Sequence, residues 1–514
     1  MTVHDGLIRR SPETHGTDPA LLLDVLERIA AEALEVHSLL VWHDGALICE
    51  AYWDPYGPDR LHMMHSVTKS VTSMAVGLAW DDGLLDLDDP VIGFFPEFRA
   101  TAAEGIGAMR LRHLLTMTSG HGRGISGGAW RKLTTSWAED FLRQPLDHAP
   151  GEVFVYDSAC SYMLSAIVQR VTGQTCHDLL RTRVFDPLGI SADLRWDLSP
   201  EGVNSGGNGL WCRSADLLRF GILHLDGGRW QGRQVLSEDW VRAATGMQLR
   251  DVSLGVLTGE AYLGPDETHE GAGAERREGY GFQWWRGPNG SYSASGLFGQ
   301  LCLVFEKERA VVAVTAGMDD EDRRLKQLIQ QELRPALGQW RGAALVPRLG
   351  ALEVEPAPPP GNAPAAWQGQ YVMAENDQGV RAVTLSVEEG GLRFAMEDAR
   401  GCHAVLAGQG RRIEGMTTMT GARLHHAYEA EGEGFRVSAW ASWTGPDAEG
   451  WSCLVLDWAY VETAFRDRLH CWVKDGALRV EREVNVNSSI RRLPDLLGQR
   501  AEVVQALDPG GVRG

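Results

Sequence analysis

Motifs for metal and redox chemistry are missing from this chain. Its eight cysteines are scattered, no two of them form a C-x-x-C pair, and none of its 16 histidines lies in an H-E-x-x-H pattern. Zinc and dithiol sites need paired spacings of this kind. The cysteines are therefore interpreted as free, buried thiols. We expect neither a metal nor an organic cofactor.

Positive charge and long apolar runs are also scarce. Lys and Arg number 49 against 69 Asp and Glu, so the formal net charge is −20. This charge repels nucleic-acid phosphates and anionic lipid, so we expect no nucleic-acid or membrane partner. No window reaches the roughly 18 apolar residues of a membrane span, and the N-terminus lacks the apolar core of a signal peptide. We expect a cytoplasmic protein that acts on a small molecule. Its oligomeric state stays open.

A proline-rich segment divides the chain. Residues 352–366 hold five prolines within nine positions and show no apolar periodicity. This composition is typical of an extended spacer between compact units. We therefore predict a catalytic domain at 1–351, a linker at 352–366 and a second domain at 367–514.

The first domain mixes helical and strand patterns. Residues 20–37 have the periodicity of an amphipathic helix, residues 38–53 indicate a hairpin that turns at Asp44-Gly45, and residues 311–317 indicate a buried strand. The predicted fold class of this domain is α+β.

The part after the linker carries mostly hairpin signals. Residues 383–396 alternate around a Gly-Gly turn, and residues 469–484 turn at Asp475-Gly476. Helical patterns are few. The sequence predicts an all-β domain, barrel-like or sandwich.

Ser66 and Lys69 stand three residues apart where a helix is predicted to begin. Apolar residues recur on one helical face from Val67 to Leu78, and residues three apart on a helix are neighbours. A serine hydroxyl needs a base to become a nucleophile, and a lysine can be that base when burial lowers its pKa. The competing interpretation is a helix cap beside a solvated lysine, because S-x-x-K alone is frequent by chance.

Several ordered blocks resemble the serine hydrolases related to class C β-lactamases and penicillin-binding proteins. The likeness spans about residues 20–335, with blocks at 65–91, 109–120, 150–173, 206–241 and 280–285. It implies a β-lactamase-like domain, with an antiparallel sheet flanked by helices and a helical subdomain. Residues 367–514 resemble, in length and strand pattern only, the lipocalin-like barrels that follow the catalytic domain of D-amino-acid-releasing peptidases.

The resemblance also implies roles for individual residues. Ser66 is the expected acylated nucleophile, Lys69 its amine partner, and Tyr156 the phenol that shuttles protons. The residues themselves predict that Tyr156 ends a short strand at 153–156, before a helix that Asp157 or Ser158 could cap. The backbone amides of Ser66 and Leu297 are the expected oxyanion hole. Ser158, Ser295 and Gly296 are expected to contact the substrate.

Two departures from the family pattern bear on the substrate. Where the family has Y-x-N, this chain has Tyr156-Asp157-Ser158, so a hydroxyl replaces a carboxamide. The third motif usually carries Lys or His, but residues 291–296 hold no cation. A substrate carboxylate would then lack its partner. Neutral esters or amides are expected to fit better, unless another cation, Arg286 being nearest in sequence, reaches the site.

Two other sequence features are candidate parts of an active site. Residues 124–128 match the G-x-S-x-G nucleophile elbow around Ser126, but no buried strand precedes them, so we interpret the match as coincidence in a loop. His62 and His65 flank the nucleophile and are expected to pack or line its rim.

The combined hypothesis is a serine hydrolase that cleaves an ester or amide through an acyl-enzyme on Ser66. A D-amino-acid-specific peptidase or carboxypeptidase, or a slow β-lactamase, is the alternative among enzymes. A non-catalytic acylatable sensor or binding module is the alternative outside enzymes. Turnover of a chromogenic ester separates the last from the others.

Overall fold

An eight-stranded antiparallel sheet forms the centre of the first domain. The computed structural model describes residues 6–125, 132–258, 261–264, 267, 276–319, 322–338, 352–419, 423–426, 428 and 434–501. The strand order is β2-β1-β16-β15-β14-β13-β12-β9. The strands are β1 Val36–His43, β2 Ala46–Tyr52, β9 Leu249–Ser253, β12 Arg276–Tyr280, β13 Trp285–Arg286, β14 Tyr292–Gly296, β15 Gln300–Phe305 and β16 Ala310–Ala316.

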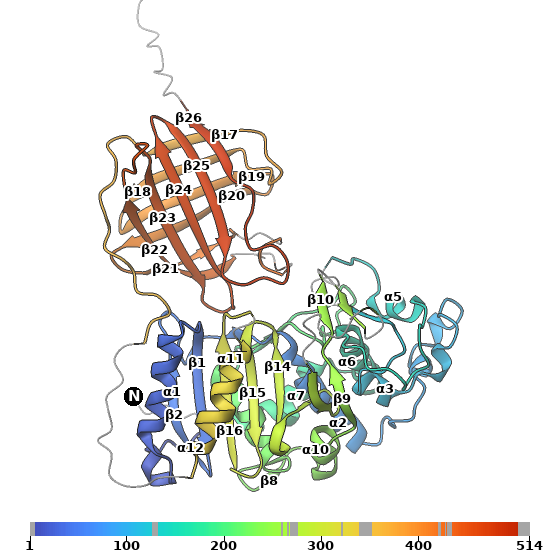
Figure 1. Ribbon diagram of the computed structural model, residues 1–514. Helices are drawn as coiled ribbons and strands as arrows, with labels where there is room; N and C mark the ends of the chain where they lie inside the picture. The colour runs from blue at the N-terminus through green and yellow to red at the C-terminus, as the bar shows by residue number, and fades with distance from the viewer. Residues whose placement is uncertain are drawn as a thin grey trace, which may run out of the picture.

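Helices cover both faces of this sheet. On one face, α1 (Pro19–Ala31), α11 (Asp322–Leu328) and the π-helical turn η9 (Ile329–Leu333) pack their apolar residues against β1, β15 and β16. These helices lie across the front of the sheet in Figure 1. On the other face, α9 (Ser214–Leu225) and α2 (Thr68–Asp81) share a larger core with the sheet.

The helix predicted at residues 20–37 is shorter than expected. The structure ends α1 at Ala31, and Val36 and His37 already belong to β1. Ala33 has a left-handed φ of 51°, which no continuing helix can hold. The predicted hairpin is confirmed, because Asp44 and Gly45 have positive φ between β1 and β2, as a two-residue hairpin turn requires.

A helical subdomain stands beside the sheet, at the right of Figure 1. Its helices include α3 Leu111–Leu115, α5 Trp137–Arg143 and α6 Ser158–Thr172, while α7 Cys176–Leu180 and α10 Glu238–Thr245 pack against α2. Helix α2 lies between this subdomain and the sheet, where α6, α7 and α9 surround it.

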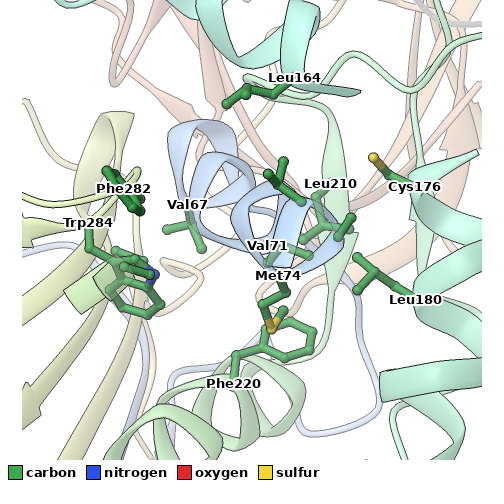
Figure 2. Packing of buried hydrophobic residues seen from close by; sticks show 14 of the residues in the cluster. Val67, Val71, Met74, Leu164, Cys176, Leu180, Leu210, Phe220, Phe282 and Trp284 are labelled. Atoms are coloured by element: carbon green, nitrogen blue, oxygen red, sulfur yellow. The ribbon is translucent and has the colours of Figure 1, made fainter. Parts of the chain in front are cut away.

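Helix α2 is buried on every side, although its sequence suggested one apolar face. Figure 2 shows Phe282 and Trp284 on one side of it, Phe220 below, and Leu180 and Cys176 on the other side. Burying an aliphatic or aromatic side chain of this size contributes about 2 kcal/mol. Apolar contacts on all sides of α2 therefore fix its position.

The polar residues of α2 are bonded to the surrounding backbone. Ser70 Oγ donates to the carbonyl of Gln283 at 2.6 Å, and Thr72 Oγ1 donates to the carbonyl of Gly206 at 2.7 Å. A buried hydroxyl without a partner is costly, so these bonds select one rotation of the helix. That rotation decides where the residues of its first turn point.

The second domain is a β-barrel, as predicted in class. Its ten-stranded sheet runs β20-β19-β18-β17-β26-β25-β24-β23-β22-β21, and an additional pairing between β20 and β22 closes it. The strands are β17 Gly369–Met373, β18 Ala382–Glu388, β19 Gly391–Asp398, β20 Gly401–Gln409, β21 Ile413–Thr417, β22 Phe435–Thr444, β23 Ser452–Tyr460, β24 Arg466–Lys474, β25 Ala477–Val484 and β26 Leu496–Arg500. The turn at Asp475-Gly476 joins β24 to β25, and both of its residues have positive φ.

The segment 352–366 is extended and contacts both domains. Asp54 N donates to the carbonyl of Leu352 at 2.8 Å, and Trp443 N donates to that of Pro360 at 2.9 Å. The barrel stands on one end of the catalytic domain (Figure 1). Arg466 of β24 bonds Glu35, next to β1, at 2.8 Å, and Asn485 bonds the same carboxylate at 2.9 Å. The two domains are thus joined by polar contacts as well as by the linker.

Helices with the length and apolarity to cross a bilayer are not found in the described parts of the chain.

Candidate active site

Ser66 lies at the junction between a short strand and helix α2. Strand β3 (His62–Met63) pairs with β6 (Leu210–Cys212), a 3-10 turn follows at His65–Val67, and α2 begins at Thr68. His65 has a left-handed φ of 46°, which reverses the chain between strand and helix. Ser66 lines a pocket of about 360 Å³.

The amine of Lys69 touches Ser66 as the helical spacing predicts. Lys69 Nζ lies 3.0 Å from Ser66 Oγ, 3.0 Å from Ser158 Oγ and 2.7 Å from the carbonyl oxygen of Gly207. A neutral amine has two N–H donors and one lone pair. Donation to Ser158 and Gly207 would leave that lone pair aimed at the Ser66 hydroxyl.

Burial prepares this amine to act as a base. Lys69 is only 1% exposed, and desolvation lowers its pKa from 10.5 to about 7, while the nearby charge of Asp157 opposes the shift. A lysine of this pKa is neutral in about half of the molecules at pH 7. It can then accept the serine proton.

Tyr156 is packed into the wall of the same pocket. Its ring stacks on Trp285 with centroids 5.4 Å apart and meets Tyr262 edge-on at 4.9 Å. Lys69 Nζ lies 4.8 Å from the ring centroid. Burial raises the pKa of Tyr156, and a hydrogen bond with Ser66 and the charge of Arg277 lower it in part. The phenol therefore stays protonated and contacts the nucleophile.

The residues after Tyr156 begin helix α6. The predicted strand at 153–156 is wrong, since only irregular structure precedes the helix there. Asp157 caps α6 by accepting a hydrogen bond from Ala159 N at 2.8 Å, and it also accepts one from Ile125 N at 2.9 Å. Burial raises the pKa of its carboxyl to about 6.

Ser158 lies behind the lysine, outside the set of residues that line the pocket. Its hydroxyl accepts a hydrogen bond from Lys69 at 3.0 Å, and its expected contact with substrate stays a prediction. A Cβ on Gly207 would come within 2.7 Å of the Ser158 carbonyl oxygen, so the glycine permits this close approach. Ser158 thus orients the amine.

Gly296 and Leu297 close the pocket next to Ser66. A Cβ on Gly296 would lie 2.4 Å from the carbonyl oxygen of Met64 and 3.1 Å from Ser66 N. Only glycine lets the end of β14 approach the first turn of α2 so closely. Ser295, Gly296 and Leu297 all line the pocket, as expected for residues that contact substrate.

The pocket lining holds both apolar and charged residues. The apolar ones include Leu254, Val256, Leu257, Tyr262 and Trp285. The polar and charged ones include Arg323 and Lys326 of α11, Asp319, and Ser488 and Arg491 from the loop between β25 and β26 of the barrel. Arg277 lines the pocket as well.

These cations overturn one premise of the sequence analysis. The third motif lacks a cation, as predicted, but the pocket does not. Arg286, the nearest candidate in sequence, is absent from the described pocket lining and donates to the carbonyls of Thr245 at 2.6 Å and Gly290 at 3.1 Å. Arg491 reaches the pocket from the other domain and pairs with Asp319.

The two histidines beside Ser66 pack in the interior. His62 Nε2 lies 3.0 Å from His37 Nδ1, and burial lowers the pKa of His62 to about 3. His65 packs against Phe298 with ring centroids 5.1 Å apart. Neither lines the pocket. Ser126, the competing serine, lies outside the described residues.

Sequence reasoning missed two contributions to the site. The carbonyl of Gly207 is 138 residues from the lysine that it binds, and its only signal was the glycine-rich stretch at residues 206–209. Ser488 and Arg491 belong to a domain to which we had assigned no role. No local pattern marks them.

A serine in the turn just before a buried helix and a desolvated lysine on the first turn of that helix, beside an antiparallel sheet, define the serine hydrolases that use a lysine base. The Beta-lactamase family matches residues 26–334 of this chain. The chain belongs to this family and is a hydrolase of the serine β-lactamase fold.

Two curated relatives of this chain are named as a hydrolase and an esterase. The chain is 26% identical over 341 residues to 6-aminohexanoate-dimer hydrolase of Paenarthrobacter ureafaciens, covering 62% of this chain and 82% of the relative. It is 35% identical over 152 residues to esterase EstB of Burkholderia gladioli, covering 26% of this chain and 38% of the relative.

Solved structures show the same fold. One described as "Putative 6-aminohexanoate-dimer hydrolase from Bacillus anthracis" matches with a TM-score of 0.50 at 17% identity. The match covers 62% of this chain and 83% of that one. At this identity the likeness concerns the fold alone.

Proposed function

We propose that the chain hydrolyses an ester or amide through an acyl-enzyme formed on Ser66. The observation that carries this proposal is the 3.0 Å contact between Lys69 Nζ and Ser66 Oγ, with the pKa of the amine lowered to about 7. Lys69 accepts the hydroxyl proton while Oγ attacks the carbonyl carbon of the substrate. A C–O bond forms, and the carbonyl oxygen becomes an oxyanion.

The backbone amides of Ser66 and Leu297 are the proposed donors to this oxyanion. The approach of Gly296 to Ser66 N supports the pairing, because it brings the two chain segments together at one end of the pocket. Amides fixed at this position need no reorganisation when the charge develops, which is how an oxyanion hole lowers a barrier.

Tyr156 and Lys69 are the proposed route for protons to and from the leaving group. As the tetrahedral intermediate collapses, the bond to the leaving alcohol or amine breaks and that group takes a proton from the Tyr156 hydroxyl. Lys69, now charged and 4.8 Å from the centre of the Tyr156 ring, returns a proton directly to the phenolate, because the acylated Oγ carries no proton. Water then attacks the acyl-enzyme with the same groups acting in reverse.

The pocket supports a substrate with an apolar part and a polar or anionic part. Leu254, Val256 and Trp285 in the pocket lining suit an apolar acyl group, and Arg491 and Lys326 in the same lining suit an anionic group. The expected preference for neutral substrates rested on the absence of a cation, so we replace it. We propose that an anionic group on the substrate is accepted at the barrel side.

The D-amino-acid-specific peptidase and the slow β-lactamase remain alternatives that use the same chemistry. The name of the relative from Paenarthrobacter ureafaciens favours short amides as one substrate class to test. A non-catalytic sensor would be acylated without turnover. A cytoplasmic location, with a small molecule as partner, is likewise a proposal, supported by eight free cysteines.

Labelling with a serine-directed phosphonate, followed by peptide mass spectrometry, tests the assignment. The adduct is expected on Ser66, and Ser66→Ala is expected to lose both labelling and turnover of a chromogenic ester. Adduct on Ser126 would overturn the assignment, and labelling of Ser66 without any turnover would favour the sensor.

A further inference from the structure

Two bulky residues flank the proposed oxyanion-hole amides in a strained backbone conformation. His65, just before Ser66, has a φ of 46°, and Phe298, just after Leu297, has a φ of 64° and a ψ of 25°. The left-handed region is unfavourable for residues with a Cβ and persists only where surrounding structure enforces it. Both amides therefore depend on whatever holds these two side chains.

Rings of the barrel domain hold them. The ring cluster consists of His65 and Phe298 from the catalytic domain and His426, Tyr428 and Phe465 from the barrel, and all five are buried. The ring centroid of Phe465 lies 5.6 Å from that of Phe298 and 6.3 Å from that of His65.

The other barrel rings complete this contact. The ring of His426 lies 6.2 Å from His65 and 6.3 Å from Phe298, and Tyr428 lies 6.1 Å from His65. Most of these pairs are edge-to-face, the arrangement that aromatic rings favour when they pack closely. Each of the two strained residues thus contacts more than one ring of the barrel.

Backbone hydrogen bonds connect the same segments. Met63 N, in the strand that leads to Ser66, donates to the carbonyl of Glu462 in the barrel at 2.8 Å. Met318 N donates to the carbonyl of Phe298 at 3.1 Å. A Cβ on the neighbouring Gly317 would lie 2.6 Å from the carbonyl oxygen of Ala464, so the barrel also presses directly on this strand end.

We propose that the barrel domain positions the oxyanion hole, and that Phe465 is its main positioning residue. The inference rests on the proposed acyl-enzyme at Ser66 and adds a catalytic role for a domain that supplies no reacting group. Without the barrel rings, His65 and Phe298 relax toward ordinary backbone conformations. The two amides then no longer converge on one oxygen atom.

The test compares two barrel variants in the full-length chain. Phe465→Leu removes a ring that touches both strained residues. Phe394→Leu is the matched control, because Phe394 lies on β19 in the barrel core and contacts Trp458 instead. Thermal unfolding of both variants is measured first, since each loses a buried ring.

The informative readout is the ratio of turnover of an ester to that of its matched thionoester. Sulfur accepts hydrogen bonds poorly, so a well-formed oxyanion hole favours the oxygen substrate strongly. For Phe465→Leu we expect kcat to fall at least about tenfold, because misplaced donors recover only part of their stabilisation. The ester-to-thionoester ratio should fall with it, while KM changes little. Phe394→Leu should keep both kcat and the ratio.

A folded Phe465→Leu variant with the wild-type ratio would overturn the inference, as would an equal fall in Phe394→Leu. If Phe465→Leu does not fold, His426→Ala removes a different ring from the same cluster. Its kcat and its ester-to-thionoester ratio then test the inference by the same criteria. Phosphonate labelling of wild-type Ser66 keeps the two hypotheses apart. A missing adduct refutes the acyl-enzyme, whereas an unchanged ratio in a labelled, active enzyme refutes only the positioning role.

Discussion

The lowered pKa of Lys69 predicts how hydrolysis depends on pH. Acylation needs the neutral amine, so kcat/KM should rise about tenfold per pH unit below about 7 and level off above it. An ordinary lysine with a pKa of 10.5 would be neutral in only about one molecule in 3,000 at pH 7. Burial therefore raises the competent fraction by about a thousandfold.

Asp157 offers a way to move this profile without touching the reacting atoms. Its charge raises the pKa of Lys69, so Asp157→Asn should shift the acid limb of kcat/KM to lower pH. The cap is kept, because Ala159 N and Ile125 N both donate to Oδ1, and an asparagine amide retains that oxygen. The change removes the charge of one buried carboxylate, together with the weak hydrogen bond that Cys160 Sγ donates to Oδ2 at 3.7 Å.

The assay is initial-rate hydrolysis of a chromogenic ester between pH 5 and 9 in buffers of constant ionic strength. The profile of kcat/KM reports groups of the free enzyme, and Ser66→Ala measures the background. An acid limb with its midpoint near 9 or above would show that Lys69 is not desolvated as described. An unmoved limb in Asp157→Asn would show that another group titrates.

Further predictions concern the other groups of the site. Tyr156→Phe should lower kcat about 10²-fold or more with little change in the unfolding temperature, and near-normal rates would make it a packing residue. Lys69→Met should abolish turnover yet stabilise the fold at pH 7, because confining the desolvated lysine costs on the order of 4 kcal/mol there, part of which its lost hydrogen bonds offset. Its advantage in thermal unfolding should shrink as pH rises from about 7 toward 10.5, since the unfolded wild type then loses its extra proton; an advantage independent of pH would contradict this. Arg491→Gln should reduce the preference for the mono-4-nitrophenyl ester of adipic acid over 4-nitrophenyl hexanoate by about three- to tenfold, as expected for a half-exposed charge. Arg492→Gln, which changes a neighbour outside the described pocket lining, should leave that preference intact, and equal effects of the two would exclude a specific anion contact.

Local spacing explains what the sequence could predict. Ser66 and Lys69 sit one turn apart on the same stretch of chain, so their contact follows from helical geometry alone. The hairpin turns at Asp44-Gly45 and Asp475-Gly476 likewise depend on two residues each. The sequence prediction failed where the apolar periodicity continues beyond the real end of a helix. Helix α1 ends at Ala31, and the left-handed Ala33 prevents it from continuing to the predicted residue 37.

Tertiary contacts explain what could not be predicted. Lys69 is desolvated by its surroundings and held by the carbonyl of Gly207, which any residue type could offer. The glycine is needed for a different reason, the closeness of Ser158. A sequence shows that a serine and a lysine are near each other, but the pKa that makes the pair reactive belongs to the assembled fold.

The third motif of this chain shows that the charge of a pocket cannot be inferred from one sequence motif. Residues 291–296 hold no cation where the family's third motif usually carries one, and by itself that absence argued for neutral substrates. The structure brings Arg491 to the same pocket from almost 200 residues further along the chain, through a loop of the barrel. A guanidinium binds an anion wherever the fold places it in space, whatever its distance along the sequence. The absence of a cation from one strand therefore does not show that the pocket lacks positive charge. The substrate preference of this hydrolase therefore has to be determined with the barrel in place.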